Sequence, residues 1–369
     1  MNQLFRWDQM GLFLLALAAG ILPFAVPEVC AAALREGLTL CSGPLLLSLF
    51  PFLVVSRLLI QCPESDLLAL PFRLAAWGIG IRTPCAARVL CIGFLGGFAP
   101  AASAAAQAVR TGQLTAEEAD ALLPACICSG PSFVVLTVGQ SLLGSAELGV
   151  LLFASQITAN YLTAALLNRF AGVRSVKPGS AAPASPAPPR LDEILADAAI
   201  TYCKLCGFIL FFRMLAAGAG ALLPAGAGTL CAILLEVCSG CDLVSRTGRW
   251  GSLLCCAALS VQGLSVLLQV RTICPPEMTL RPLYRSRLLH LPLSLALIYL
   301  LLPGGEADVF STLPARVLLM RRVPPDCALL VFAVCCMAAC TLRSGIRQVE
   351  QKQMARNAGG CCINSKTLL

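Results

Sequence analysis

The chain has 369 residues, of which 58% are hydrophobic and only 12% charged, and its mean hydropathy is +0.82. Soluble domains carry about 25% charged residues, so this composition excludes an ordinary water-soluble exterior and predicts a multi-pass protein of the cell membrane. The 27 Lys and Arg against 19 Asp and Glu give a net charge of +8. Basic residues that flank membrane segments account for this excess, and no nucleic-acid partner is expected.

The first part of the chain, residues 1–170, is expected to form one half of the membrane domain. A retained first helix is expected over residues 10–26, with a cleaved signal peptide as the alternative. Residues 44–60 and 148–170 are apolar enough to span a bilayer. Between these spans, Thr115 and Glu118 have the spacing of a capping box, which predicts the start of a polar helix.

The most informative stretch is residues 126–140, an apolar run interrupted by Ser129-Gly130-Pro131. Pro131 has no backbone N–H and disfavours helix for the residue before it, and Gly130 weakens a helix further. Unpaired backbone at membrane depth persists only where it is buried in protein or lines a wet cavity. Such interruptions in both halves of a membrane protein indicate a transporter binding site. A simple turn between two helices is the alternative.

Residues 171–190, rich in Pro, Ala and Ser, are predicted to be a cytoplasmic linker to a second membrane half. That half covers residues 191–302, with a second interruption expected at Ser239-Gly240. Residues 303–342 should hold a loop and a last transmembrane helix, and residues 343–369 a polar tail. The expected fold is therefore an all-α polytopic membrane protein of about eight transmembrane helices, some of them re-entrant or broken.

A repeat within the two halves is a further hypothesis. Arg57 and Arg213 each follow an apolar run that begins with Phe, and residues 93–100 are paired with residues 260–270 as Gly-containing apolar segments. Other apolar helices with an arginine would look similar, so the possibility of no repeat stays open.

Three ionisable residues, Arg57, Arg213 and Glu236, lie inside apolar runs. A carboxylate near the centre of a bilayer costs about 2.5–3.5 kcal/mol on insertion scales, so it is rarely kept without a partner or a task. Glu236 is expected either to form an ion pair with Arg213 or to bind a cation or relay a proton.

Cysteine is abundant, with 21 residues, most of them in apolar runs where a thiol behaves as a small hydrophobe. Cys203-x-x-Cys206 and Cys238-x-x-Cys241 match a metal or redox spacing. Chance pairs are expected at this cysteine content, and the sole histidine, His290, is expected at a membrane boundary. We therefore expect no metal and no other cofactor. No grouping typical of an enzyme active site is present, and no enzymatic activity is expected.

Several motifs occur in an order that is familiar from one family. They are Ser48-Leu-Phe-Pro51-Phe52-Leu, Gly93-Phe-Leu-Gly-Gly97-Phe98, Ser129-Gly130-Pro131, Leu234-Leu-Glu236-Val-Cys-Ser-Gly240 and Gly263-Leu-Ser265-Val-Leu-Leu-Gln269-Val. From about residue 37 to residue 302, the chain resembles the sporulation integral membrane proteins of the YlbJ type, which carry the Gate or nucleoside-recognition domain. The resemblance implies a transporter-like fold and a role in endospore formation, particularly of the cortex; the domain's name also implies a nucleoside ligand.

The chain departs from the family's pattern at polar positions. The family's Asn pair is Ile127 and Cys128 here, its serine is Gly96, its proline is Ala99 and its histidine is Leu267. These changes remove polar groups that a ligand could use.

Two functions follow as hypotheses. The first is movement of a small solute or ion across the membrane, with the bilayer, an unidentified solute and other sporulation membrane proteins as partners. The candidate substrate or pathway residues are Gly96, Gly97, Ser129, Gly130, Pro131, Glu236, Ser239, Gly240, Gly263, Ser265 and Gln269. The alternative is a scaffold or assembly factor for cortex enzymes that transports nothing, which the lost polar residues favour.

Overall fold

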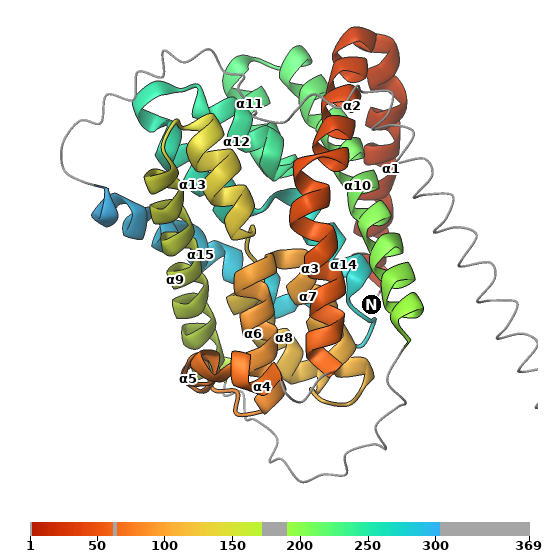
Figure 1. Cartoon of the computed structure of the whole chain (residues 1–369). Coiled ribbons are helices and arrows are strands. Elements are labelled where there is room, and N and C mark those ends of the chain that lie inside the picture. The colour runs from red at the N-terminus through yellow and green to blue at the C-terminus, as the bar shows by residue number, and fades with distance from the viewer. Residues whose placement is uncertain (1, 62–64, 172–189, 303–369) are drawn as a thin grey trace, which may run out of the picture.

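The computed structural model describes residues 2–61, 65–171 and 190–302, and within these ranges the chain is almost entirely helical, without a strand (Figure 1). The all-α prediction is therefore confirmed. The predicted segments 303–342 and 343–369, and the linker apart from its ends, lie outside the described residues.

Four stretches of the described chain are long and apolar enough to cross a membrane, which suggests a membrane protein. They are Pro27–Leu47, Ala146–Ala171, Leu191–Leu222 and Gly248–Ile273. Their outward faces carry large apolar side chains exposed to the surroundings, such as Leu166 and Phe170. Five further apolar stretches of the described chain have only 10–17 residues, fewer than the roughly 20 that a span requires: Phe13–Ala25, Leu49–Ile60, Pro84–Gly96, Ser132–Leu142 and Ala225–Leu235. The count of about eight spans remains a prediction.

The first half of the chain contains a helical hairpin followed by an interrupted helix. The hairpin consists of α6 (Pro84–Gly96) and α7 (Phe98–Arg110), which pack against each other. Next come α8 (Ala116–Cys126), an interruption at residues 127–131, and the π-helix η1 (Ser132–Leu142). The long helix α9 (Ala146–Ala171) then packs against both α8 and η1.

The second half repeats this order. The helices α11 (Ala225–Leu235) and α12 (Val237–Ser245) form a hairpin, and α13 (Gly251–Val261) and α14 (Gly263–Ile273) form an interrupted helix. The final described helix, α15 (Arg281–Leu301), packs against α9 and α13. Figure 1 places α6 and α7 in its lower half and α11 and α12 in its upper half, so the two hairpins lie toward opposite ends of the molecule.

This arrangement corrects the pairing drawn from the sequence. Residues 93–100, at the tip of the first hairpin, correspond by element order to the tip of the second hairpin near Glu236. Residues 260–270 instead hold the interruption between α13 and α14, which corresponds to residues 127–131. Both segments, 93–100 and 260–270, contain glycine among apolar residues, so composition could not distinguish a hairpin tip from an interrupted helix.

The described chain contains further helices outside these two sets. They are α1 (Asn2–Ala25), α2 (Pro27–Ser42), α3 (Pro44–Gln61), α4 (Ser65–Leu68), α5 (Leu70–Gly78), the short η2 (Gly248–Trp250) and α10 (Leu191–Leu222). Of these, α10 packs against α2, α3 and α11 and so joins the two halves. Helix α8 begins with the predicted capping box: the Glu118 N–H donates to Thr115 Oγ1 at 3.1 Å, and the Thr115 N–H donates to Glu118 Oε2 at 3.2 Å.

Candidate binding site between the interrupted helices

The tip of the first hairpin lies against the interruption between α8 and η1. Gly97, between α6 and α7, has a φ of +81°, and a Cβ atom there would lie 2.6 Å from the backbone nitrogen of Gly130. The predicted interruption at Ser129-Gly130-Pro131 is confirmed, since α8 ends at Cys126 and η1 begins at Ser132. Only glycine meets both the backbone conformation and the close approach at position 97.

The second hairpin meets its own interrupted helix in the same way. Gly263 has a φ of +67°, and a Cβ atom there would lie 3.1 Å from the backbone nitrogen of Glu236. Gln262, immediately before it, is also left-handed with a φ of +67° and separates α13 from α14. In each half, the hairpin tip therefore crosses the interruption of the following helix.

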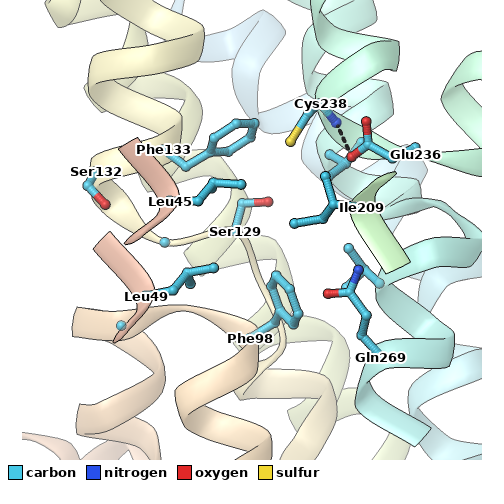
Figure 2. Close-up of a pocket in the computed structure, with 14 residues that line it drawn as sticks. Leu45, Leu49, Phe98, Ser129, Ser132, Phe133, Ile209, Glu236, Cys238 and Gln269 are labelled. Carbon is cyan, nitrogen blue, oxygen red and sulfur yellow. Dashed lines mark hydrogen bonds between the residues drawn. The ribbon is translucent and has the colours of Figure 1, made fainter. Parts of the chain in front are cut away.

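The two crossings face a shared cavity with a volume of about 40 Å³, lined from both halves (Figure 2). About 10–15 Å³ of such volume holds one water molecule, so there is room for a few waters or a small polar group. The lining residues are Leu45, Leu49, Gly96, Phe98, Ser129, Gly130, Ser132, Phe133, Ile209, Glu236, Val237, Cys238, Val266 and Gln269. Of the residues expected to serve a substrate, Gly96, Ser129, Gly130, Glu236 and Gln269 thus come together.

Glu236 is itself the break in the second hairpin. It has an extended backbone, with φ −150° and ψ +123°, and its side chain is 1% exposed. Its carboxylate caps α12, accepting the Cys238 N–H at 2.8 Å, the Ser239 N–H at 2.7 Å and the Ser239 hydroxyl at 2.8 Å. A negative charge at a helix N-terminus is stabilised both by these bonds and by the helix dipole.

The expected break at Ser239-Gly240 is wrong. Both residues lie within α12, and Gly240 instead allows α12 to pack on α11, where a Cβ would lie 3.0 Å from the Ile233 Cα. The sequence points to the wrong residues because Ser and Gly are common in turns, whereas an acidic residue that caps a helix leaves a weaker signal.

Gln269 presents an unsatisfied polar atom to the cavity. The side chain is 1% exposed, and its Nε2 donates to Ser265 Oγ at 2.8 Å. Its Oε1 has no hydrogen-bond partner among the described residues. Figure 2 shows the amide turned toward Phe98 and Ile209 across the cavity. A buried acceptor without a partner carries a desolvation cost of about 1–3 kcal/mol, which a donor in the cavity would remove.

The ion pair between Glu236 and Arg213, one of the two alternatives expected for Glu236, is not formed. Arg213 Nη2 donates to Glu36 Oε2 on α2 at 2.7 Å, so the guanidinium joins α10 to α2 rather than to the hairpin tip. Arg57 likewise pairs with Asp197, with 2.9 Å between Nη1 and Oδ2. Two of the three ionisable residues in apolar runs therefore form structural pairs outside the cavity lining.

A second polar cluster lies behind the first interruption, between α9, α13 and α15. Arg287 is 8% exposed, and no carboxylate among the described residues lies within ion-pair distance of it. Its Nη2 donates to Asn160 Oδ1 at 3.3 Å, and Asn160 Nδ2 donates to the carbonyl of Ile127 at 3.3 Å. Arg287 is thus connected through one side chain to the backbone of the interruption.

His290 belongs to the same cluster, and its place at a membrane boundary stays a prediction. It is fully buried, with Nε2 3.2 Å from the carbonyl of Gln156, whose own Nε2 donates to Ser260 Oγ at 2.9 Å. Sequence reasoning missed Gln156 and Asn160. Their spacing of four residues, which puts them on one face of an apolar helix, is the signal that could have found them.

The cysteines of the described ranges are all free thiols. In this part of the chain, no group of three or more His, Cys, Asp and Glu side chains is arranged to hold a metal ion. Of the two Cys-x-x-Cys pairs, only Cys238 reaches the cavity; Cys241 is buried in the core behind it.

No family model, curated protein or solved structure matches this chain.

Proposed function

We propose that this protein is a membrane carrier that binds a small solute in the cavity between the two crossings and moves it across the bilayer. The observation that carries the proposal is the convergence of two hairpin tips and two interrupted helices, one set from each half, on one mainly apolar cavity with a few polar groups, among them Ser129, Glu236 and Gln269. Non-helical backbone at membrane depth is tolerated where it lines such a cavity, and discontinuous helices at a repeat interface are a recurring way to build a transport site.

The repeated architecture also supplies a means of movement. Each hairpin contacts its own interrupted helix through backbone, with glycine at Gly97, Gly130 and Gly263. A rocking motion of one repeat against the other would open the cavity first to one side and then to the other. The cell membrane as location, and a solute used in endospore formation, are the setting that the resemblance to YlbJ-type proteins implies.

The native thiol of Cys238 tests this proposal. Figure 2 shows its sulfur beside Phe133 on the cavity wall. The test treats right-side-out and inside-out vesicles with a small membrane-impermeant methanethiosulfonate and measures modification of individual cysteines by mass spectrometry. A carrier should show modification of Cys238 from both sides, while Cys241, buried one turn further along α12, should stay unmodified and serves as the control.

The alternative, a scaffold for cortex enzymes, predicts a different result. A scaffold has no need to open its centre, so Cys238 should be closed to the reagent from at least one side at all times. Modification from only one side, or from neither, would contradict the carrier. A Ser129→Trp variant, which fills the cavity, should abolish labelling of Cys238 in a carrier.

A further inference from the structure

The first-half wall of the cavity lacks negative charge at its helix N-termini, and the second-half wall lacks a hydrogen-bond donor for Gln269. We propose that the ligand is a small dipolar solute, with an anionic group at the first-half wall and a hydrogen-bond donor at Gln269. An α-amino acid with a small side chain is the simplest solute of this kind. This inference rests on the proposed function, because it names the class of solute for the same cavity.

The first-half wall has two helix N-termini without a side-chain cap. Helix α7 begins after Gly97 and η1 after Pro131, and neither preceding residue provides a capping side chain. Phe98, Ser132 and Phe133, in the first turns of these helices, line the cavity. The counterpart of α7 in the second half, α12, receives the carboxylate of Glu236, whereas the counterpart of η1, α14, also lacks a side-chain cap. A bound anion would supply to the first half the negative charge that Glu236 supplies to the second.

Arg287 adds a positive charge behind the same wall. It is buried without a carboxylate partner in the described chain, and Asn160 connects it to the carbonyl of Ile127 at the start of the interruption. A buried cation without a counter-charge is costly in a membrane protein. An anion in the cavity would offset that charge, so the wall is suited to a carboxylate and not to a cation.

The second-half wall of the cavity has an acceptor that needs a hydrogen-bond donor. Gln269 Oε1 is buried, lacks a partner and belongs to a residue that lines the cavity. The carboxylate of Glu236 lies on the same wall and adds negative charge. An ammonium group would donate to Gln269 and be attracted by Glu236. Leu45, Leu49 and Ile209 complete the lining and leave space only for a small apolar side chain.

Three matched probes test the two ends separately on the full-length protein in nanodiscs. L-alanine carries both charged groups, propionate lacks the amine, and ethylamine lacks the carboxylate. Binding is measured as the concentration of each probe that protects Cys238 from the thiol reagent. L-alanine should protect at a concentration at least about tenfold lower than either half-molecule, because each charge-assisted hydrogen bond contributes about one decade or more of affinity.

Gln269→Leu should raise the L-alanine concentration required by about tenfold and leave the propionate value unchanged, since propionate has no donor for this residue. Arg287→Met should weaken L-alanine and propionate alike and leave ethylamine unchanged. If Gln269 had a purely structural role, Gln269→Leu would raise the protecting concentrations of all three probes together. That result would overturn the inference that a donor of the ligand binds Gln269.

Protection by propionate at the same concentration as L-alanine would overturn the dipolar ligand and leave a simple anion site. Protection by uridine but not by L-alanine would overturn this inference in favour of a nucleoside and leave the carrier standing. A Cys238 that never reacts from both sides of the membrane would overturn the carrier itself, so the two failures are distinguishable.

Discussion

The tips of the two hairpins occupy equivalent places in the element order of the two halves and are built in opposite ways. Gly97 brings only backbone to its tip, packed against the backbone of Gly130. Glu236 brings a carboxylate that closes the N-terminus of the helix it begins. A side chain at position 97 is excluded by the 2.6 Å approach, so the first tip cannot cap its own helix. One tip is complete by itself, and the other leaves its helix end available to a ligand.

The largest effect is expected from adding one methyl group to the uncapped tip. Gly97→Ala places a Cβ 2.6 Å from the Gly130 nitrogen in a left-handed residue. At a φ of +81° and a ψ of −161°, a region open essentially only to glycine, backbone strain costs about 1–3 kcal/mol and overpacking about 1–3 kcal/mol, so the free energy of unfolding should fall by about 3–4 kcal/mol. The measurement is the thermal unfolding midpoint of purified protein in detergent.

Gly80→Ala is the matched control for this change. Gly80 also has a left-handed backbone, with a φ of +90°, but nothing lies within 4 Å of its Cβ position. This variant should lose only the strain of about 1–2 kcal/mol. Gly263→Ala, where the closest backbone atom is 3.1 Å away, should fall between the two. Equal losses at positions 97 and 80 would show that the tip is not packed against the interruption.

A substitution at the second hairpin tip, where Glu236 caps α12, should lower the free energy of unfolding less than Gly97→Ala does. Glu236→Gln keeps an oxygen acceptor but removes the charge that accepts two N–H groups and one hydroxyl. Hydrogen bonds to charged groups contribute about 1.5–3 kcal/mol, so a loss of about 2 kcal/mol in the free energy of unfolding is expected, measured by the same unfolding assay.

Thr115→Ala removes the neutral cap of α8 and provides the comparison. It should cost about 1 kcal/mol, the usual value for a lost N-cap, and leave ligand protection of Cys238 unchanged. If Glu236→Gln were as stable as the unchanged protein, the carboxylate would not be serving as a cap, and the difference between the two tips would have to be sought elsewhere.

Local chemistry was predictable from the sequence where one residue decides the structure. Pro131 cannot donate a backbone hydrogen bond, so the first interruption is visible in the sequence, as is the capping box at Thr115. The breaks at Gly97 and Gln262 were not predicted, because glycine and glutamine are compatible with a helix unless another segment crosses them. Long-range ion pairs were not predictable either, because they depend on tertiary packing. Arg213 pairs with Glu36 through the packing of α10 on α2, which no spacing in the sequence reveals.

The smallest effect should come from the pair that replaces the expected contact between Glu236 and Arg213. Glu36 is largely exposed, with 62% of its side chain accessible, so its 2.7 Å contact with Arg213 should contribute only about 0.5–1 kcal/mol. A double-mutant cycle with Glu36→Gln and Arg213→Leu should therefore give an interaction energy of that size. The same cycle with Glu236→Gln and Arg213→Leu should give a smaller value, because no hydrogen bond joins these residues and the α12 N-terminus already neutralises much of the carboxylate charge. A larger value for Glu236 would mean that its field, acting through the protein interior, outweighs the direct contact. Glu236 would then stabilise the protein through its interaction with Arg213 on α10 as well as by capping α12.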